Sequence, residues 1–212
     1  GISMIVDLIA YYKGMQQTDL IGKLGILVFI IVLGYESISE AFEKIKEGQK
    51  ADFYKEMAVT DTMTGVYNRS AFQEWEHETS DYEGYSIATF DLNNLKWCND
   101  NLGHAAGDAY IQASARIIKE IFGSHGKCYR IGGDEFCTVI NQKSKKFDNA
   151  RHVKQLRELE KYAEKELGIK GLNVQIACGY AEYDIKTDKN FEDTRSRADK
   201  KMYESKRRLK RE

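Results

Sequence analysis

The hydrophobic pattern divides the chain into an apolar amino-terminal part and a longer part in which strands and helices alternate. Residues 24–35 contain no charged side chain, and only Lys23 separates them from two further apolar positions. Between residues 36 and 60 the apolar positions recur about once per helical turn among many Glu and Lys residues, with a break near Gly48. From residue 61 onward, short apolar runs alternate with amphipathic stretches, which predicts a mixed α/β domain.

Six elements are predicted in this domain. They are a strand at 85–92, a helix at 108–122, a glycine-turn hairpin at 127–140, a helix at 148–167, a strand at 174–183 and a closing helix at 194–209. The first strand, YSIATFDL, is nearly all apolar, as expected for a central strand covered on both faces. The order of these elements predicts an antiparallel-containing sheet with helices on one face.

The uncharged run at 24–35 bears on where the protein resides. Its twelve residues are fewer than the roughly twenty that span a bilayer. Extension through Lys23, whose long side chain can reach the interface, brings the run near the lower limit. We therefore predict a membrane-associated helical segment over 1–35, with a buried core helix or a dimer-packing helix as alternatives. A cleaved signal peptide fits poorly, because the run lacks a basic start and a small-residue cleavage site.

The following stretch, 36–60, is predicted to be a helical connector. Ile38, Phe42 and Ile45 recur at helical spacing, and Phe53 and Met57 resume the pattern. Such a narrow apolar seam suits pairing with a second copy of the chain, and equally a single amphipathic helix lying on its own domain.

Overall composition excludes some classes of function. The formal net charge is −1, so there is no broad electrostatic case for binding nucleic acid. Proline is absent, which suits long helices. The four cysteines are scattered without a Cys-x-x-Cys pair, which favours reduced thiols in a cytosolic compartment over a disulfide framework.

The candidate chemistry centres on the run YRIGGDEF at 129–136. Two glycines are expected to supply the positive φ angles of a tight turn and to leave bare backbone for a large anionic ligand. Asp134 and Glu135 follow on that turn, and Asp91 lies at the end of a buried strand, where a carboxylate is costly unless something binds it. If these carboxylates converge, they favour a Mg²⁺ site. The alternative interpretation of each acidic residue, taken alone, is a charged side chain on the protein surface.

Asn99 and Asp108 are suited to reading a guanine base. The carboxylate of Asp108 can accept from both N–H donors of guanine, while the Asn99 amide can donate to its carbonyl. The alternative for Asp108 is an N-cap or first-turn acid of the following helix. Lys96, Lys206 and Lys210 could reach phosphate oxygens, although a solvated basic tail is the simpler interpretation for the end of the chain.

Four ordered motifs carry a family resemblance: DTMTGVYNR at 61–69, the stretch 91–108, RIGGDEF at 130–136 and ADKKMYESK at 198–206. With these motifs, residues 61–210 resemble the GGDEF domain, the catalytic module of bacterial diguanylate cyclases. The resemblance implies an α/β (α+β) fold like that of nucleotide cyclases and polymerase palms, with an antiparallel-containing sheet and flanking helices. Here it would follow an amino-terminal helical segment.

The resemblance also implies roles at matching positions. Mg²⁺, with Mn²⁺ as an alternative, would be held by Asp91, the Leu92 carbonyl and Asp134. The implied catalytic residues are Asp134, Glu135 and Lys96. The implied substrate-binding residues are Asn99, His104, Asp108, Gly132, Gly133, Lys206 and Lys210, the last at a place where the family often has Arg.

The implied activity is condensation of two GTP molecules into cyclic di-GMP and pyrophosphate by a homodimer. The implied organisation is a membrane-associated segment at 1–35, a signalling linker at 36–60 and the catalytic domain at 61–212. The catalytic domain would lie in the cytoplasm at the bacterial inner membrane, or the whole protein in the cytoplasm if the first segment is not a span. Alternatives are an inactive GGDEF module that binds GTP or a protein partner, and a cyclase that also accepts adenine nucleotides.

One departure from the family pattern generates a prediction. Many relatives carry an inhibitory Arg-x-x-Asp motif shortly before the glycine turn, and here those places hold Gly123 and Gly126. Neither glycine supplies the guanidinium or carboxylate that binds cyclic di-GMP. We predict weak or absent product inhibition through this site, measured as initial rates with added product. A sub-micromolar inhibition constant that survives mutation of the substrate pocket would contradict it.

Overall fold

The computed structural model describes residues 2–14, 20–142 and 147–211. The chain forms two compact units, Gly1–Tyr54 and Lys55–Glu212. The domain limits predicted at residues 35 and 60 stay a prediction.

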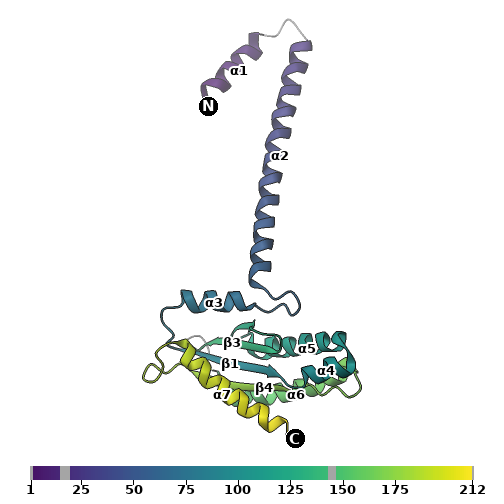
Figure 1. Ribbon diagram of the computed structural model, residues 1–212. Helices are drawn as coiled ribbons and strands as arrows, with labels where there is room; N and C mark the ends of the chain where they lie inside the picture. Colours follow the sequence, from purple (N-terminus) through teal and green to yellow (C-terminus); the bar gives the residue numbers. More distant parts are fainter. Residues whose placement is uncertain (1, 15–19, 143–146, 212) are drawn as a thin grey trace. The chain divides into compact units, whose positions relative to one another are not determined.

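Two helices make up the amino-terminal unit, α1 (Ile2–Gly14) and the first part of α2 (Leu20–Val59) (Figure 1). The predicted connector at 36–60 is helical up to Val59, and α2 continues without interruption through Gly48, where the apolar pattern breaks. A glycine within a helix costs only about 1 kcal/mol relative to alanine, too little to end a helix of this length.

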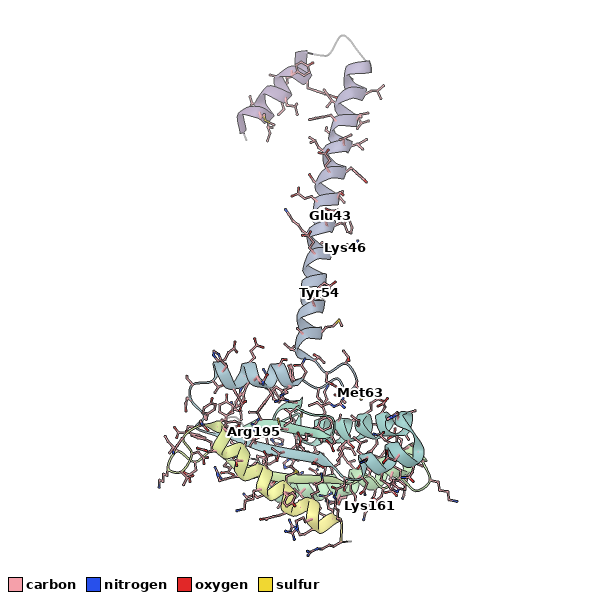
Figure 2. The ribbon with its side chains drawn as sticks, in the orientation of Figure 1. Glu43, Lys46, Tyr54, Met63, Lys161 and Arg195 are labelled. Carbon is pink, nitrogen blue, oxygen red and sulfur yellow. The ribbon has the colours of Figure 1, made fainter. Side chains whose placement is uncertain are left out.

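The surface of this unit is strongly apolar. Large side chains of α2 such as Phe29, Ile31 and Phe42 are exposed, with polar residues such as Glu43 projecting among them (Figure 2). Side chains of α1 and α2 also line an apolar groove of about 400 Å³. Within the described residues one helical stretch, Gly22–Glu47, is long and apolar enough to cross a bilayer.

The carboxy-terminal unit is built on a four-stranded antiparallel sheet. Its strands are β1 (Tyr85–Leu92), β2 (Gly126–Arg130), β3 (Glu135–Asn141) and β4 (Ile176–Glu182). Their spatial order is β2-β3-β1-β4, so β1 and β3 are the two inner strands. The predicted central strand and the hairpin are confirmed, and β1 has the bounds predicted from its apolar run.

Helices cover both faces of this sheet, which corrects the prediction of helices on one face (Figure 1). They are α3 (Arg69–Glu78), α4 (Leu95–Leu102), α5 (His104–Phe122), α6 (Asn149–Leu167) and α7 (Phe191–Leu209). Side chains of α5 and α6 pack with Phe90 and Leu92 on one face, while α3 and α7 pack with Ile87 and Val139 on the other. Sequence reasoning missed α3 and α4, whose short amphipathic stretches lie beside motif residues.

Helix α7 approaches β4 unusually closely. A Cβ atom added at Gly179 would lie 2.1 Å from the carbonyl oxygen of Ala198 and 2.3 Å from the backbone nitrogen of Met202. Only a glycine leaves room for the helix backbone at this point. The close approach fixes where the later turns of α7 lie along the sheet.

A single side chain joins the last turn of α2 to the first turn of α3. Asn68 donates from Nδ2 to the Ala58 carbonyl at 2.8 Å, and its backbone N–H donates to the Val59 carbonyl at 2.9 Å. Its Oδ1 accepts from the Ala71 N–H at 3.0 Å, the bond expected of a helix N-cap. Asn68 therefore caps the end of one helix and the beginning of the next.

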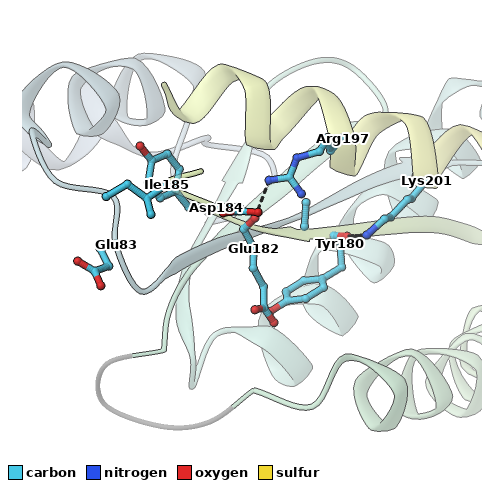
Figure 3. Close-up of a pocket in the computed structure, with 9 residues that line it drawn as sticks. Glu83, Tyr180, Glu182, Asp184, Ile185, Arg197 and Lys201 are labelled. Atoms are coloured by element: carbon cyan, nitrogen blue, oxygen red, sulfur yellow. Dashed lines mark hydrogen bonds between the residues drawn. The ribbon is translucent and has the colours of Figure 1, made fainter. Parts of the chain in front are cut away.

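The turn between β4 and α7 contains a buried ionic cluster. The Asp188 carboxylate accepts hydrogen bonds from Arg197, from the Thr194 hydroxyl at 2.8 Å and from the Asp184 N–H at 3.0 Å. A pocket of about 540 Å³ borders this cluster, and in Figure 3 Arg197 and Lys201 extend from α7 to the carbonyls of Glu182 and Tyr180.

The Asp188 cluster generates a stability prediction. Burial alone would raise the pKa of Asp188, but hydrogen bonds from Arg197, Asp184 and Thr194 lower it to about 2. A lowered carboxyl pKa adds stability above the unfolded-state value near 4, and that stability is lost as pH falls toward 2. We expect Asp188→Asn to lower the free energy of unfolding at pH 7 by about 2 kcal/mol in denaturant titrations, because hydrogen bonds to a charged group are lost.

The matched control is Glu83→Gln, which alters an exposed carboxylate on the rim of the same pocket and should leave stability unchanged. The difference between Asp188→Asn and the native chain should shrink between pH 4 and pH 2. A difference that stays constant over this range would rule out an electrostatic role for Asp188.

Candidate functional site

The site begins with a carboxylate at the end of the inner strand β1. Asp91 pairs across the sheet with Glu135, the first residue of β3, and directly paired residues point to the same face. The second pair further along that face, Ile87 and Val139, packs in the core with α7. Asp91 is only 7% exposed, whereas Glu135 is exposed.

Lys206 of α7 supplies the positive charge beside Asp91. Its Nζ donates to Asp91 Oδ2 at 2.7 Å and lies 2.6 Å from Oδ1. Burial raises the pKa of Asp91, Lys206 opposes that rise, and the Asp134 carboxylate adds to it. Lys210, just beyond the end of α7, also acts to lower the pKa of Asp91. These effects place both lysines and Asp134 in the electrostatic environment of Asp91.

The glycine turn lies against the end of the same strand. The N–H of Leu92 donates to the carbonyl of Asp134 at 3.0 Å, while the N–H groups of Ile131 and Gly132 donate to the Glu135 carbonyl. The backbone of the turn is thus hydrogen-bonded directly to the strand that carries Asp91.

The prediction that Gly132 and Gly133 supply positive φ angles is wrong, because neither residue has one. Their small size matters instead. A Cβ atom at Gly132 would lie 2.9 Å from Oε2 of Glu135, whose side chain folds back over the turn. At Gly133 a Cβ would meet nothing within 4 Å, so this glycine borders open space.

Arg130 stabilises the glycine turn through hydrogen bonds to its carbonyl groups. Its Nη2 and Nε donate to the Gly133 carbonyl at 2.8 and 3.3 Å, and Nε lies 3.2 Å from the Gly132 carbonyl. Its Nη1 pairs with the Asp61 carboxylate at 3.2 Å. Partial burial would raise the pKa of Asp61, but hydrogen bonds from Thr64 and the charge of Arg130 lower it overall. Sequence reasoning included Arg130 and Asp61 in motifs without seeing that they bind each other.

Asn99 and Asp108 come from the facing helices α4 and α5. The amide of Asn99 packs over Gly107, where an added Cβ would lie 1.8 Å from Asn99 Oδ1, so Asn99 adjoins the residue before Asp108. The alternative role of Asp108 as an N-cap or first-turn acid is wrong, because α5 begins at His104 with Gly103 as its cap. Asp108 is exposed in the second turn and is left available for a ligand.

The remaining candidates lie on the exposed surface of the same helices. Lys96 is in the first turn of α4, and His104 is the first residue of α5. The preceding Asn94 has the left-handed backbone (φ 63°) that starts α4 directly after the strand. The chain therefore passes from Leu92 into α4 within two residues, which keeps Lys96 close in sequence to the strand end.

A buried tyrosine, missed by sequence reasoning, fixes the chain just beyond Leu92. The hydroxyl of Tyr110 lies 2.9 Å from the carbonyls of both Asn93 and Gln175 and accepts from the Gln175 N–H at 3.0 Å. Tyr110 is fully buried, so burial raises the pKa of its hydroxyl, which stays protonated and able to donate. The sequence feature that could have indicated this role is a hydroxyl-bearing residue on the apolar face of α5.

The acidic residues suit a hard divalent cation. Asp91 is buried with the Lys206 ammonium as its ion-pair partner, and the nearby Asp134 carboxylate disfavours ionisation of Asp91 unless positive charge is present. Among the described residues no cluster of three or more His, Cys, Asp or Glu side chains is arranged to hold a metal. Mg²⁺ would thus need backbone carbonyl, water or phosphate oxygens to complete its shell, as is usual for this ion.

The domain consists of an antiparallel sheet flanked by helices, and its acidic residues lie where the inner strands meet the glycine turn. This arrangement defines a nucleotide-cyclase-like α/β domain. Residues 58–212 match the family model "Diguanylate cyclase, GGDEF domain". The chain therefore belongs to the GGDEF domain family, which confirms the resemblance found in the sequence.

Individual relatives agree with this assignment. The cyclic di-GMP phosphodiesterase PdeB of Shewanella oneidensis is 35% identical over 128 residues, covering 58% of this chain and 15% of the relative. The diguanylate cyclase DgcN of Escherichia coli K12 is 39% identical over 87 residues, covering 39% of this chain and 21% of the relative. The chain thus spans less than a quarter of either relative.

Solved structures share the fold. The coiled coil and GGDEF domain of DgcB from Caulobacter crescentus, in complex with c-di-GMP, superposes with a TM-score of 0.67 at 22% identity, covering 82% of this chain and 94% of that one. Diguanylate cyclase SiaD from Pseudomonas aeruginosa, in complex with its activator SiaC, gives 0.61 at 22% identity, covering 97% and 78%.

The packing of Asn99 on Gly107 allows its contribution to be tested without changing Asn99 itself. We expect Gly107→Ala to displace the Asn99 amide and to weaken GTP binding roughly tenfold, as for the loss of one hydrogen bond to the base. Alanine is favoured over glycine within helices, so the fold should persist. Calorimetric GTP titration and thermal unfolding measure the two effects.

The matched control is Gly34→Ala in α2, where an added Cβ meets nothing within 4 Å. Unchanged GTP affinity in Gly107→Ala, with a folded protein, would remove Asn99 from the nucleotide site.

Proposed function

We propose that the chain is a diguanylate cyclase that condenses two GTP molecules into cyclic di-GMP and pyrophosphate. The observation that carries the proposal is the buried Asp91 carboxylate, paired with Lys206 and bonded through the adjacent Leu92 backbone to the Gly132–Asp134 turn. Bare backbone, convergent acids and a lysine are the combination that a metal-bound triphosphate requires. Membership in the family described as "Diguanylate cyclase, GGDEF domain" supports this class of reaction.

In the proposed mechanism the protein mainly positions and stabilises charge. Asp91, the Leu92 carbonyl and Asp134 would hold Mg²⁺, with Mn²⁺ as a substitute. When bound, the metal would polarise the α-phosphate and lower the pKa of the attacking 3′-hydroxyl. Lys206, which lies against Asp91 in the free protein, would turn its ammonium to the phosphates, and Lys96 and Lys210 would add positive charge.

The chemical step proposed is in-line attack by each 3′-oxygen on the α-phosphate of the other GTP. A carboxylate of Asp134 or Glu135 takes the hydroxyl proton as the new ester bond forms. The bond between the α- and β-phosphates breaks, and pyrophosphate leaves. Gly132 and Gly133 leave backbone open beside the phosphates; Gly133 in particular borders empty space.

The base would be read from the α4 and α5 side of the site. Asp108, exposed in the second turn of α5, would accept from the two guanine N–H groups, and Asn99 would donate to the carbonyl. His104 would shape the wall of this pocket. An adenine would leave Asp108 without its donors, which disfavours ATP.

Two subunits are needed, because each site holds one GTP and the reaction joins two. The exposed apolar positions Ile38, Phe42 and Ile45 on α2 support pairing with a second copy. The uncharged, exposed run before them supports membrane association, with the catalytic unit in the cytoplasm. The chain would thus be the output end of a membrane-associated sensor.

The alternative is a catalytically inactive GGDEF module that binds GTP or a protein partner. One matching relative is named a cyclic di-GMP phosphodiesterase, so the family match alone does not specify synthesis. The presence of Asp91, Lys96, Asn99, Asp108 and the complete GGDEF turn in this chain favours the cyclase.

The proposal predicts a specific product. The purified chain with Mg²⁺ and GTP should form cyclic di-GMP, identified by mass, with a rate per subunit that rises with protein concentration. ATP alone should give no cyclic dinucleotide. Asp134→Ala should lower turnover by at least about a hundredfold while leaving thermal unfolding unchanged, and removal of Mg²⁺ by a chelator should have the same effect.

The control is Glu78→Ala, which removes an exposed carboxylate at the end of α3. GTP binding without product at every protein concentration would establish the inactive module instead. A mixed product in the presence of both nucleotides would overturn guanine selection by Asp108.

A further inference from the structure

Two histidines from separate elements meet at the end of the sheet opposite to Asp91. His125 lies in the turn between α5 and β2, where its carbonyl accepts from the N–H of Asn141, the last residue of β3. His152 is a buried residue of α6. Their Nε2 atoms are 3.1 Å apart. We propose that His125 and His152 form a binding site for a zinc-class divalent cation, separate from the nucleotide site.

The second ring nitrogen of His152 is already oriented as in metal sites. His152 Nδ1 hydrogen-bonds the backbone carbonyl of Asp148, and because a carbonyl can only accept, Nδ1 carries the proton. In the neutral ring this leaves a lone pair on Nε2, the nitrogen that lies 3.1 Å from Nε2 of His125. Metal-ligating histidines almost always donate their other N–H to a carbonyl or carboxylate in this way.

Packing holds the His152 ring in place. It stacks on Phe147 with centroids 4.4 Å apart and planes 12° from parallel. Phe147 also contacts the His125 ring edge-on at 5.3 Å, so one aromatic side chain supports both imidazoles. A ligand pair held by such packing needs little rearrangement to bind a cation.

The separation of the two nitrogens fits a shared metal ion. With zinc–nitrogen bonds of about 2.0–2.1 Å, atoms 3.1 Å apart subtend roughly 100° at the metal, close to the tetrahedral angle. The ring centroids are only 4.8 Å apart, closer than a head-on approach of two nitrogens at this distance permits. The two imidazoles therefore do not form a straight, head-on hydrogen bond, which leaves room for a cation beside the line between the two nitrogens.

The site opens into a cavity of about 430 Å³ that offers room for further ligands. Besides the histidines, it is lined in part by Ser124, Glu120, Gln155 and Glu158. Within the described part of the chain no third His, Cys, Asp or Glu completes the set, so water would fill the remaining positions. Imidazole ligands favour Zn²⁺ over Mg²⁺, which prefers oxygen.

The proposal predicts one Zn²⁺ site per chain that depends on both histidines. Titration of the whole chain with zinc chloride, without nucleotide, should show calorimetric binding that weakens at least about tenfold in His125→Gln and in His152→Gln. His77→Gln, which alters an exposed histidine of α3, is the matched control and should leave the affinity unchanged. Asp134→Ala should also retain the site, because it alters only the opposite end of the sheet.

A second measurement uses the unaltered protein, so the result does not depend on the folding of a variant. Nitrogen–proton NMR correlations of the imidazoles should show the Nε2 signals of His125 and His152 shifting together on addition of Zn²⁺, while His77 stays unchanged. If neither signal moves, or if zinc binding persists at full affinity in both variants, the pair is a hydrogen bond between two imidazoles and the proposal is overturned.

Discussion

A carboxylate buried at the end of a strand requires positive charge nearby, and the arrangement of the carboxy-terminal unit follows from how Asp91 obtains it. The Lys206 ammonium can reach Asp91 only if α7 lies tightly along the sheet, and Gly179 permits that by leaving the helix backbone room against β4. Burial and the Asp134 carboxylate raise the pKa of Asp91, whereas Lys206 lowers it. Lys206 and any bound cation would therefore stabilise the same negative charge, that of Asp91. The fold and the proposed chemistry therefore have the same requirement, a positive charge beside Asp91. Without it, the unpaired buried carboxylate would destabilise the folded protein and the proposed site.

The glycine turn receives its stability from its surroundings more than from its own backbone. Neither Gly132 nor Gly133 has a positive φ angle, and the turn is held by hydrogen bonds from Arg130 to its carbonyls and from Leu92 to the Asp134 carbonyl. Arg130 in turn depends on Asp61, which Thr64 orients. The result is a turn whose peptide groups are fixed on one side and open on the other, where a phosphate chain could lie.

Much of the fold could be predicted because its elements have strong local signals. The apolar run of β1 gave the correct strand bounds, and the order of the motifs identified the family. The errors have physical causes. Asp108 is not a cap, because α5 begins four residues earlier at His104. The helices α3 and α4 were not predicted, because their sequences lie beside motifs that were interpreted only as ligand-binding residues.

The site was predictable only where a residue acts through its own chemistry. The carboxylates, lysines and amide could be identified as candidates from residue type and spacing. The supporting roles of Arg130 and Tyr110 depend on partners 69 and 65 residues away in sequence, and that of Gly107 depends on how α4 packs on α5, which no local pattern specifies. The meeting of His125 with His152 was likewise invisible, since the two lie on separate elements whose proximity arises from tertiary packing.

The double cap formed by Asn68 has a mechanical consequence. Between the end of α2 and the start of α3 the backbone turns sharply, yet Asn68 bonds to both helix ends, and Tyr67 beside it exchanges backbone hydrogen bonds with Cys128 and Arg130. Hydrogen bonds thus connect the segment between α2 and α3 to both helices and to β2. A displacement of the last turn of α2 would therefore be transmitted through Asn68, Tyr67 and β2 to Arg130, whose guanidinium binds the carbonyls of the glycine turn.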